Sequence, residues 1–129
     1  MQTRLFSAVA LACSLAGIAV AASQPSTDDE RRAAITVMRA INTAEHAVKR
    51  STGKFVALDA ILDHPAMARV RANIAADGTR LMHQGAQIKL ALNQDALGYQ
   101  VMVVPAATCG TAAFSDEGGM IYTGKVLDC

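Results

Sequence analysis

The spacing of hydrophobic residues changes twice along this chain. An apolar stretch without any charged residue runs from Leu5 to Val20. Beyond residue 28 the apolar positions recur at intervals of three and four, at Ala34, Val37, Met38, Ile41, Ala44 and Val48. This spacing predicts one amphipathic helix from about Asp28 to Arg50. After Gly85 the interval becomes two, which is typical of strands with one buried face.

Both ends of the predicted helix carry the residues expected there. Thr27 and Glu30 have the spacing of a capping box, and Asp28 to Glu30 place negative charge at the positive end of the helix dipole. Lys49 and Arg50 suit the opposite end. Gly53 can then end the helix in a left-handed conformation.

The segment from Phe55 to Arg80 has a less regular pattern. Residues 56–62 predict a short helical turn, which ends before Pro65 because the residue preceding a proline avoids the helical region. Residues 66–76 predict a second short helix with Met67, Val70 and Ile74 on one side. Asp77-Gly78 predicts a turn.

The alternating part of the chain predicts four strands: Ile88–Leu92, Tyr99–Val104, about Thr111–Ser115, and Met120–Tyr122 or beyond. Asp116-Glu117-Gly118-Gly119 predicts a hairpin turn between the last two. One long helix followed by hairpin-linked strands predicts an α+β fold, in which a small antiparallel sheet packs its apolar face on the helix.

The N-terminus has the organisation of an export signal. One basic residue, Arg4, precedes the apolar stretch, and Ala19-Val20-Ala21 supplies the small residues that signal peptidase accepts. We therefore expect residues 1–21 to be a cleaved secretory signal peptide, and residues 22–129 to form a single domain. The alternatives are a retained membrane anchor, since the apolar run to Ala22 is 18 residues long, and lipidation at Cys13, which Ala10-Leu11-Ala12 fits poorly.

Composition narrows the classes of partner. Loss of Arg4 leaves 11 of the 12 basic residues against 11 acidic ones, with no basic cluster, and this argues against a nucleic-acid partner. The chain has no Trp and few aromatic residues, which argues against a carbohydrate or peptide site built on aromatic platforms.

Cleavage would also leave an even number of cysteines, Cys109 and Cys129. In an oxidising compartment this predicts an intramolecular disulfide, worth about 3 kcal/mol in the chain-entropy model for a loop of this size. The alternatives are two free thiols or an intermolecular link.

Two segments resemble known proteins. Ala40-Ile41-Asn42-Thr43-Ala44-Glu45, followed by Gly53, Phe55, Leu58 and Leu62, resembles the second half of the long helix and the adjoining loop of bacterial type IV pilins and type II secretion pseudopilins. Phe114 to Tyr122 resembles their late hairpin, and the two cysteines stand where many pilins carry a C-terminal disulfide. The resemblance extends from about Arg32 onward. It implies a pilin-like headpiece, although the Gly-Phe processing site and the acidic residue of the pilin N-terminus are absent from this sequence.

Candidate sites for chemistry are few. His46, His64 and His83 have no metal-ligand spacing, and we expect them to be solvated or locally bonded. The resemblance to pseudopilins, some of which bind calcium in such loops, makes Asp116, Glu117 and Asp128 a candidate calcium site, although a plain hairpin turn explains the same residues. Ser51 and Ser115 lie in no nucleophile motif. We therefore predict no catalytic residue, no cofactor and no metal.

These observations predict an exported, non-enzymatic, pilin-like protein that contacts protein partners at the bacterial envelope, in the periplasm or outside the cell. Once the signal is cleaved, we expect no membrane association. One alternative is a membrane-anchored minor pilin or pseudopilin that keeps its N-terminal segment. The other is a small secreted enzyme or inhibitor, which would need a pocket with converging polar groups near His46, His64 or His83.

Overall fold

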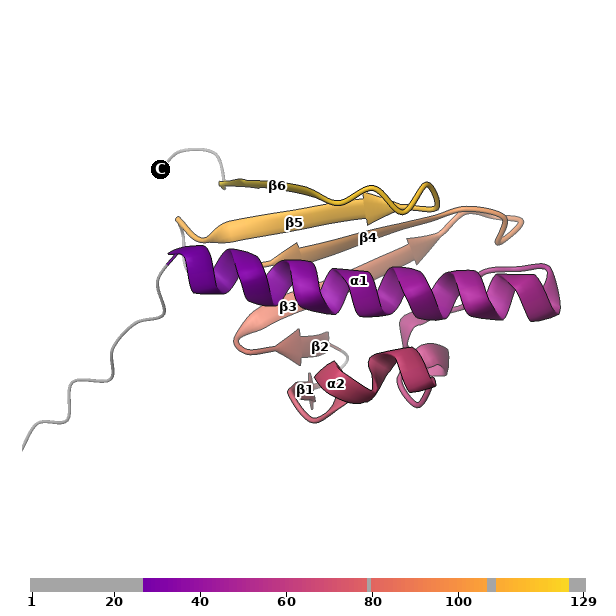
Figure 1. The fold of residues 1–129 in the computed structure, drawn as a ribbon, viewed down its shortest axis with the longest axis horizontal. Helices are drawn as coiled ribbons and strands as arrows, with labels where there is room; N and C mark the ends of the chain where they lie inside the picture. The colour runs from indigo at the N-terminus through magenta and orange to yellow at the C-terminus, as the bar shows by residue number, and fades with distance from the viewer. Residues whose placement is uncertain (1–26, 79, 107–108, 126–129) are drawn as a thin grey trace, which may run out of the picture.

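A computed structural model describes residues 27–78, 80–106 and 109–125. A long helix, α1 (Thr27–Thr52), lies across one face of a six-stranded sheet (Figure 1). Three short helical segments follow it: η1 (Leu58–Ile61), η2 (Pro65–Met67) and α2 (Ala68–Arg71). The strands are β1 (Ile74–Asp77), β2 (Arg80–His83), β3 (Ala86–Leu92), β4 (Tyr99–Val104), β5 (Thr111–Asp116) and β6 (Tyr122–Lys125). The predicted α+β class is confirmed.

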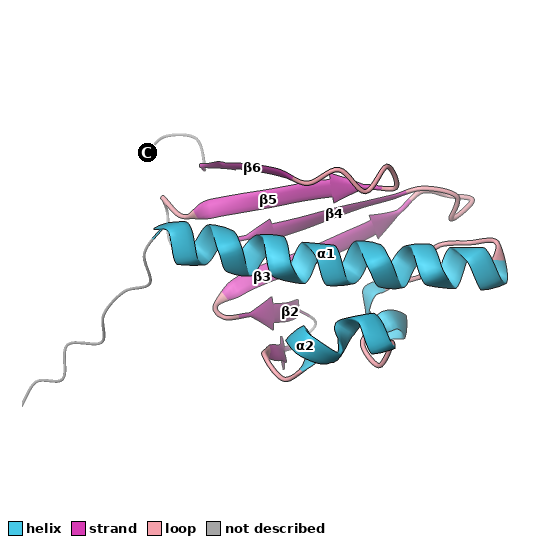
Figure 2. Cartoon of the chain, viewed as in Figure 1, coloured by secondary structure: helices cyan, strands magenta, loops and turns pink. Residues whose placement is uncertain are grey.

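The sheet is an antiparallel meander, in which each strand pairs with its neighbours in the sequence (Figure 2). β3 and β4 form the longest ladder, from Gln87↔Val104 to Leu92↔Tyr99. β4 then pairs with β5, and both strands lie under α1.

The amphipathic pattern accounts for the position of α1. The predicted stripe is buried against the sheet, except that Val48 is only half-buried. Gly53 has a φ of +84° and its amide donates to the Lys49 carbonyl over 2.7 Å, which ends the helix as predicted. The helix is slightly longer than predicted and includes Thr27, whose side chain lies outside the described residues.

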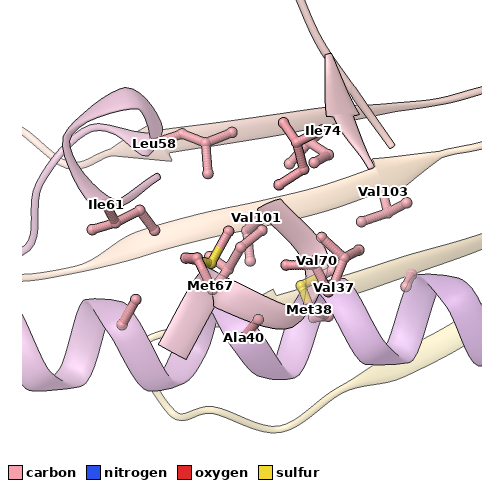
Figure 3. Close-up of a cluster of buried hydrophobic side chains, with 14 of the residues drawn as sticks. Val37, Met38, Ala40, Leu58, Ile61, Met67, Val70, Ile74, Val101 and Val103 are labelled. Carbon is pink, nitrogen blue, oxygen red and sulfur yellow. The ribbon is translucent and has the colours of Figure 1, made fainter. Parts of the chain in front are cut away.

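The hydrophobic core lies between α1, the sheet and the short helices. Val101 and Val103 of β4 face Val37 and Met38 of α1 (Figure 3). Met67 of η2 and Val70 of α2 fill the space beside α1, where they close one flank of this layer.

The prediction for residues 66–76 is wrong in its second half. The helical part ends at Arg71, and Ile74 begins β1, which pairs with β2. β1 and β2 were not predicted at all. The turn that joins β2 to β3 explains the error: Gln84 and Gly85 both have positive φ, 49° and 82°, as a two-residue hairpin requires, and this turn draws residues 80–83 into the sheet.

The last strand also differs from its prediction. Gly119 has a φ of +75° and its amide donates to the Asp116 carbonyl over 2.9 Å, so the predicted turn is present. However, β6 begins at Tyr122 and not at Met120. The Met120 carbonyl accepts a hydrogen bond from the Ser115 hydroxyl over 2.8 Å, which holds Met120 within the connection.

Candidate interaction surface

The two faces of the sheet have different surroundings. α1 and the short helices cover one face, and within the described residues no helix or strand lies on the other, which we call the open face (Figures 1 and 2). β4 shows the alternation clearly, because Val101 and Val103 are buried beneath α1 whereas Gln100 and Met102 are exposed. Residues directly opposite each other on antiparallel strands share a face, so the register of the sheet defines the rest of the open face.

Large side chains form one row across the open face. The register pairs Lys89 with Met102, Met102 with Phe114, and Phe114 with Tyr122. We call these four residues the cross-strand row. Met102 is 42% exposed and Tyr122 is 56% exposed, and the Phe114 and Tyr122 rings lie 6.4 Å apart between centroids. Methionine and aromatic side chains are enriched at protein interfaces, so this row is the best candidate for a contact surface.

A buried hydrogen-bond network holds the opposite face of the same strands to α1. The Tyr99 hydroxyl donates to Asn42 Oδ1 over 2.7 Å, and Asn42 Nδ2 donates to Ser115 Oγ over 2.8 Å. Asn42 Nδ2 also approaches the Gly119 carbonyl at 3.3 Å. One side chain of α1 thus joins β4, β5 and the connection that precedes β6. Such a network needs partners that are distant in the sequence, and the spacing of α1 residues does not reveal them.

Glu45 is a buried carboxyl group in the middle of this layer. Its residue is 0% exposed, Oε2 accepts the Val56 amide over 3.1 Å, and Oε1 has no hydrogen-bond partner. Burial raises the pKa of Glu45, and the bond from the Val56 amide partly offsets that increase. The carboxyl group fixes the loop after α1, because its Oε2 receives that loop's amide.

Aromatic rings surround the end of α1 near Glu45. Phe55 and Tyr99 pack edge to face with centroids 4.7 Å apart, and His46 packs edge to face on Phe55 at 5.6 Å. Lys49 Nζ lies 4.3 Å from the centroid of the Phe55 ring. Burial, followed by the negative charge of Glu45, raises the pKa of Tyr99, so its hydroxyl stays protonated and donates to Asn42.

The histidines have three separate environments. His46 packs in the aromatic cluster, and His64 Nδ1 accepts the Ala66 amide over 3.1 Å at the start of η2. His83 is only 4% exposed and burial lowers its pKa, so this histidine is not solvated. Among the described residues, no group of three or more His, Cys, Asp or Glu side chains is placed to hold a metal ion.

The candidate calcium residues lie in and beyond the β5–β6 turn. Asp116 Oδ1 accepts the Gly118 amide over 2.9 Å, which is an ordinary turn interaction. Glu117 lies close to Gly98, where a β-carbon would come within 3.3 Å of the Glu117 carboxyl carbon. Asp128 lies outside the described residues, so the proposed set of three ligands stays a prediction.

A cavity of about 460 Å³ opens near the N-terminal end of α1. Its described lining includes Asp29 and Glu30 of α1, His83 of β2, and Cys109. Glu30 packs over the backbone of Gly110, where a β-carbon would lie 3.3 Å from Glu30 Oε2. Cys129, the predicted disulfide partner of Cys109, lies outside the described residues. The predicted signal peptide, residues 1–21 with Cys13, also lies outside them.

Comparison of the chain with protein-family models, with curated proteins and with solved structures finds no match. Within the residues that the structure describes, no helix is long and apolar enough to cross a membrane.

Proposed function

We propose that this protein is an exported, non-enzymatic, pilin-like headpiece that acts through protein–protein contacts at the bacterial envelope. The observation that carries the proposal is the cross-strand row on the open face, where Met102 and Tyr122 are exposed to solvent. A long helix followed by an antiparallel meander is also the order that the pilin resemblance leads us to expect.

The shape of this surface suits a protein partner better than a small molecule. The row is a continuous line of side chains on four adjacent strands, and it lies outside both the cavity beside α1 and the hollow around Tyr99 and Glu117. Interfaces of this kind use aromatic and methionine side chains as anchors and polar residues as the rim. Gln100 and Asp116, which pair directly beside the row, provide such polar positions.

In-cell photo-crosslinking tests this function. A photoreactive amino acid is placed at Met102, and the same amino acid is placed at Thr43 as the matched control, since Thr43 is exposed on α1. We expect Met102 to give a crosslinked envelope protein that mass spectrometry identifies, and Thr43 to give none. Equal crosslinking at both sites, or none at Met102, would contradict the proposal.

The state of the N-terminus separates the two envelope hypotheses. N-terminal sequencing of the protein recovered from the cell envelope should begin at Ala22 if the signal peptide is removed. A protein that begins at Met1 would instead be the anchored minor pilin or pseudopilin.

The cavity beside α1 favours a second candidate, a small-ligand site. Its volume of about 460 Å³ lies within the usual range of ligand pockets, and it combines a buried imidazole with carboxylates. Burial lowers the pKa of His83, so at neutral pH the ring is uncharged and can accept a hydrogen bond. Carboxylates and a neutral imidazole suit an amine that carries a short apolar chain.

Butylamine is a suitable probe for that site. We expect chemical-shift changes in NMR spectra that are confined to the cavity residues and are lost in Glu30→Gln. If the spectra do not change, the cavity is not an amine site, and the interaction hypothesis stands alone.

A further inference from the structure

We infer that the partner on the open face is a second copy of this chain, packed sheet to sheet; this inference rests on the proposed function. The cross-strand row is self-complementary. Its order across four adjacent strands is Lys89, Met102, Phe114, Tyr122, so a cation and a thioether lie on one half and two aromatic rings lie on the other.

A two-fold axis that runs parallel to the strands, between β4 and β5, makes this complementarity explicit. Such an axis places β3 over β6 of the second copy and β4 over its β5. Lys89 then meets the Tyr122 ring of the second copy, which is a cation–π arrangement. Met102 meets the Phe114 ring of the second copy, which is a favourable sulfur–aromatic contact. Symmetry forms each contact twice.

The polar positions beside the row agree with the same axis. Gln100 pairs with Asp116 across β4 and β5. The two-fold rotation places Gln100 over Asp116 of the second copy, where an amide can donate to a carboxylate. Along these two rows the axis therefore places no like charges opposite each other, and each charged group faces an aromatic ring or an amide.

Charge also favours a second copy over other occupants. The chain has 12 basic and 11 acidic residues, so two copies do not repel each other strongly at long range. The row has one cation, Lys89, whereas a nucleic acid or an anionic membrane surface would need a cluster of them. A different protein is the remaining alternative, and the experiment below distinguishes it.

The size of the face sets the expected affinity. Four strands at about 4.8 Å spacing and about five residues at about 3.4 Å rise give a projected face on the order of 300 Å². Stable complexes bury about 800 Å² of accessible surface per partner, so we expect a weak, reversible dimer with a dissociation constant in the micromolar range or above. Packed sheets would lie about 10 Å apart, with their strands about 30° from parallel.

Sedimentation equilibrium of the protein purified from the cell envelope is the first test, at concentrations from roughly 10 to roughly 500 µM to bracket a weak interface. We expect the average mass to rise toward twice the monomer mass. Met102→Glu places a carboxylate against the Phe114 ring of the second copy, and Tyr122→Lys places a second cation opposite Lys89; each should weaken dimerisation at least tenfold. Thr43→Glu and Thr43→Lys make the same kinds of charge change on α1, and both should dimerise like the wild type. Circular dichroism confirms that each variant is folded.

Cross-linking tests the axis itself. Under the proposed symmetry Lys89 lies close to Tyr122 of the second copy. The two Lys89 residues of the dimer are separated across the strands by three strand spacings, or about 14 Å. A short bismaleimide should therefore link a mixture of Lys89→Cys and Tyr122→Cys proteins, and should link neither protein alone.

Three results would overturn the inference: a wild-type protein that stays monomeric, a dimer that Met102→Glu leaves unchanged, or efficient linking of Lys89→Cys to itself. A monomer that still crosslinks an envelope protein through Met102 refutes the second copy and leaves the proposed function intact. A monomer that crosslinks nothing refutes both.

Discussion

Asn42 should be the largest single polar contributor to the attachment of α1 to the sheet. Its side chain makes two short hydrogen bonds, from the Tyr99 hydroxyl at 2.7 Å and to Ser115 Oγ at 2.8 Å, and a longer one to the Gly119 carbonyl. Asn42→Ala removes all three and leaves the Tyr99 hydroxyl buried without its acceptor. Buried donors that lose their partner carry a desolvation cost in addition to the lost bond.

The expected loss follows from these bonds. Two short bonds at about 1 kcal/mol each, with about 1 kcal/mol for the stranded Tyr99 hydroxyl, amount to about 3 kcal/mol. Alanine is the better helix former and returns about 0.6 kcal/mol. The free energy of unfolding should therefore fall by about 2.5 kcal/mol, a large part of the stability of a domain of this size.

Urea unfolding followed by far-UV circular dichroism measures this loss. Thr43→Ala is the matched control, because Thr43 is the adjacent exposed residue and its hydroxyl donates to the Arg39 carbonyl of the same helix. Its effect should stay within about 0.5 kcal/mol. In a Tyr99→Phe background, Asn42→Ala should cost about 2 kcal/mol less, because the Tyr99 bond and the hydroxyl that would be stranded are both already absent. A loss below about 0.5 kcal/mol for Asn42→Ala, or strictly additive effects with Tyr99→Phe, would refute the reasoning.

Two further predictions concern buried and cross-linked groups. Burial raises the pKa of Glu45 in the folded protein above its ordinary value of 4.5. The protonated carboxyl group therefore favours the folded state below pH 4.5, and this stabilisation is lost as the pH rises through the pKa of the folded protein. The free energy of unfolding of Glu45→Gln, measured in urea, should therefore rise relative to that of the wild type between pH 4 and pH 7. His83 has the opposite pH dependence, but it is present in both proteins and cancels in the difference. A difference that stays constant with pH would show that Glu45 does not titrate this way. If the predicted disulfide joins Cys109 to Cys129, the unreduced protein should titrate no thiols and Cys109→Ser should lower the free energy of unfolding by about 3 kcal/mol. Two reactive thiols in the unreduced protein would disprove that bond.

The helix and the later strands were predictable because their patterns are long and local. Ala34 to Ala44 repeat at helical spacing over several turns, and this stripe is buried as its period requires. Tyr99 to Val104 form a short run rich in valine that Pro105 ends, and β4 has those bounds. Here local preference and tertiary packing favour the same structure.

The first hairpin was missed because its local preferences compete with its final structure. Ile74 is followed by two alanines, which are good helix formers, so the sequence alone favours extension of the preceding helix. In the fold, the pairing of Ile74 with His83 places both side chains on the covered face, and packing decides the outcome. The burial of His83 was missed for the same reason, since nothing in its sequence neighbourhood marks it as a core residue.

The cross-strand row and the Asn42 network could not be predicted, because both depend on the register between strands. Phe114 and Tyr122 are neighbours only because β5 and β6 pair at that offset. A shift of one residue would move Phe114 to the covered face and Ser115, which Asn42 requires, to the open face. The position of every residue on the open face therefore depends on contacts made on the covered face.

This dependence links stability to association. Ser115 faces Asn42, and Phe114 lies beside it on the opposite face, so the buried network fixes the strand that carries part of the row. Association adds stability by mass action, because only the folded protein has the complementary face. The free energy of unfolding of the wild type should thus rise with protein concentration, whereas that of Met102→Glu should not. Asn42→Ala destabilises the monomer itself. At low protein concentration it should therefore lower the free energy of unfolding by the same amount in the wild type and in the variant at position 102.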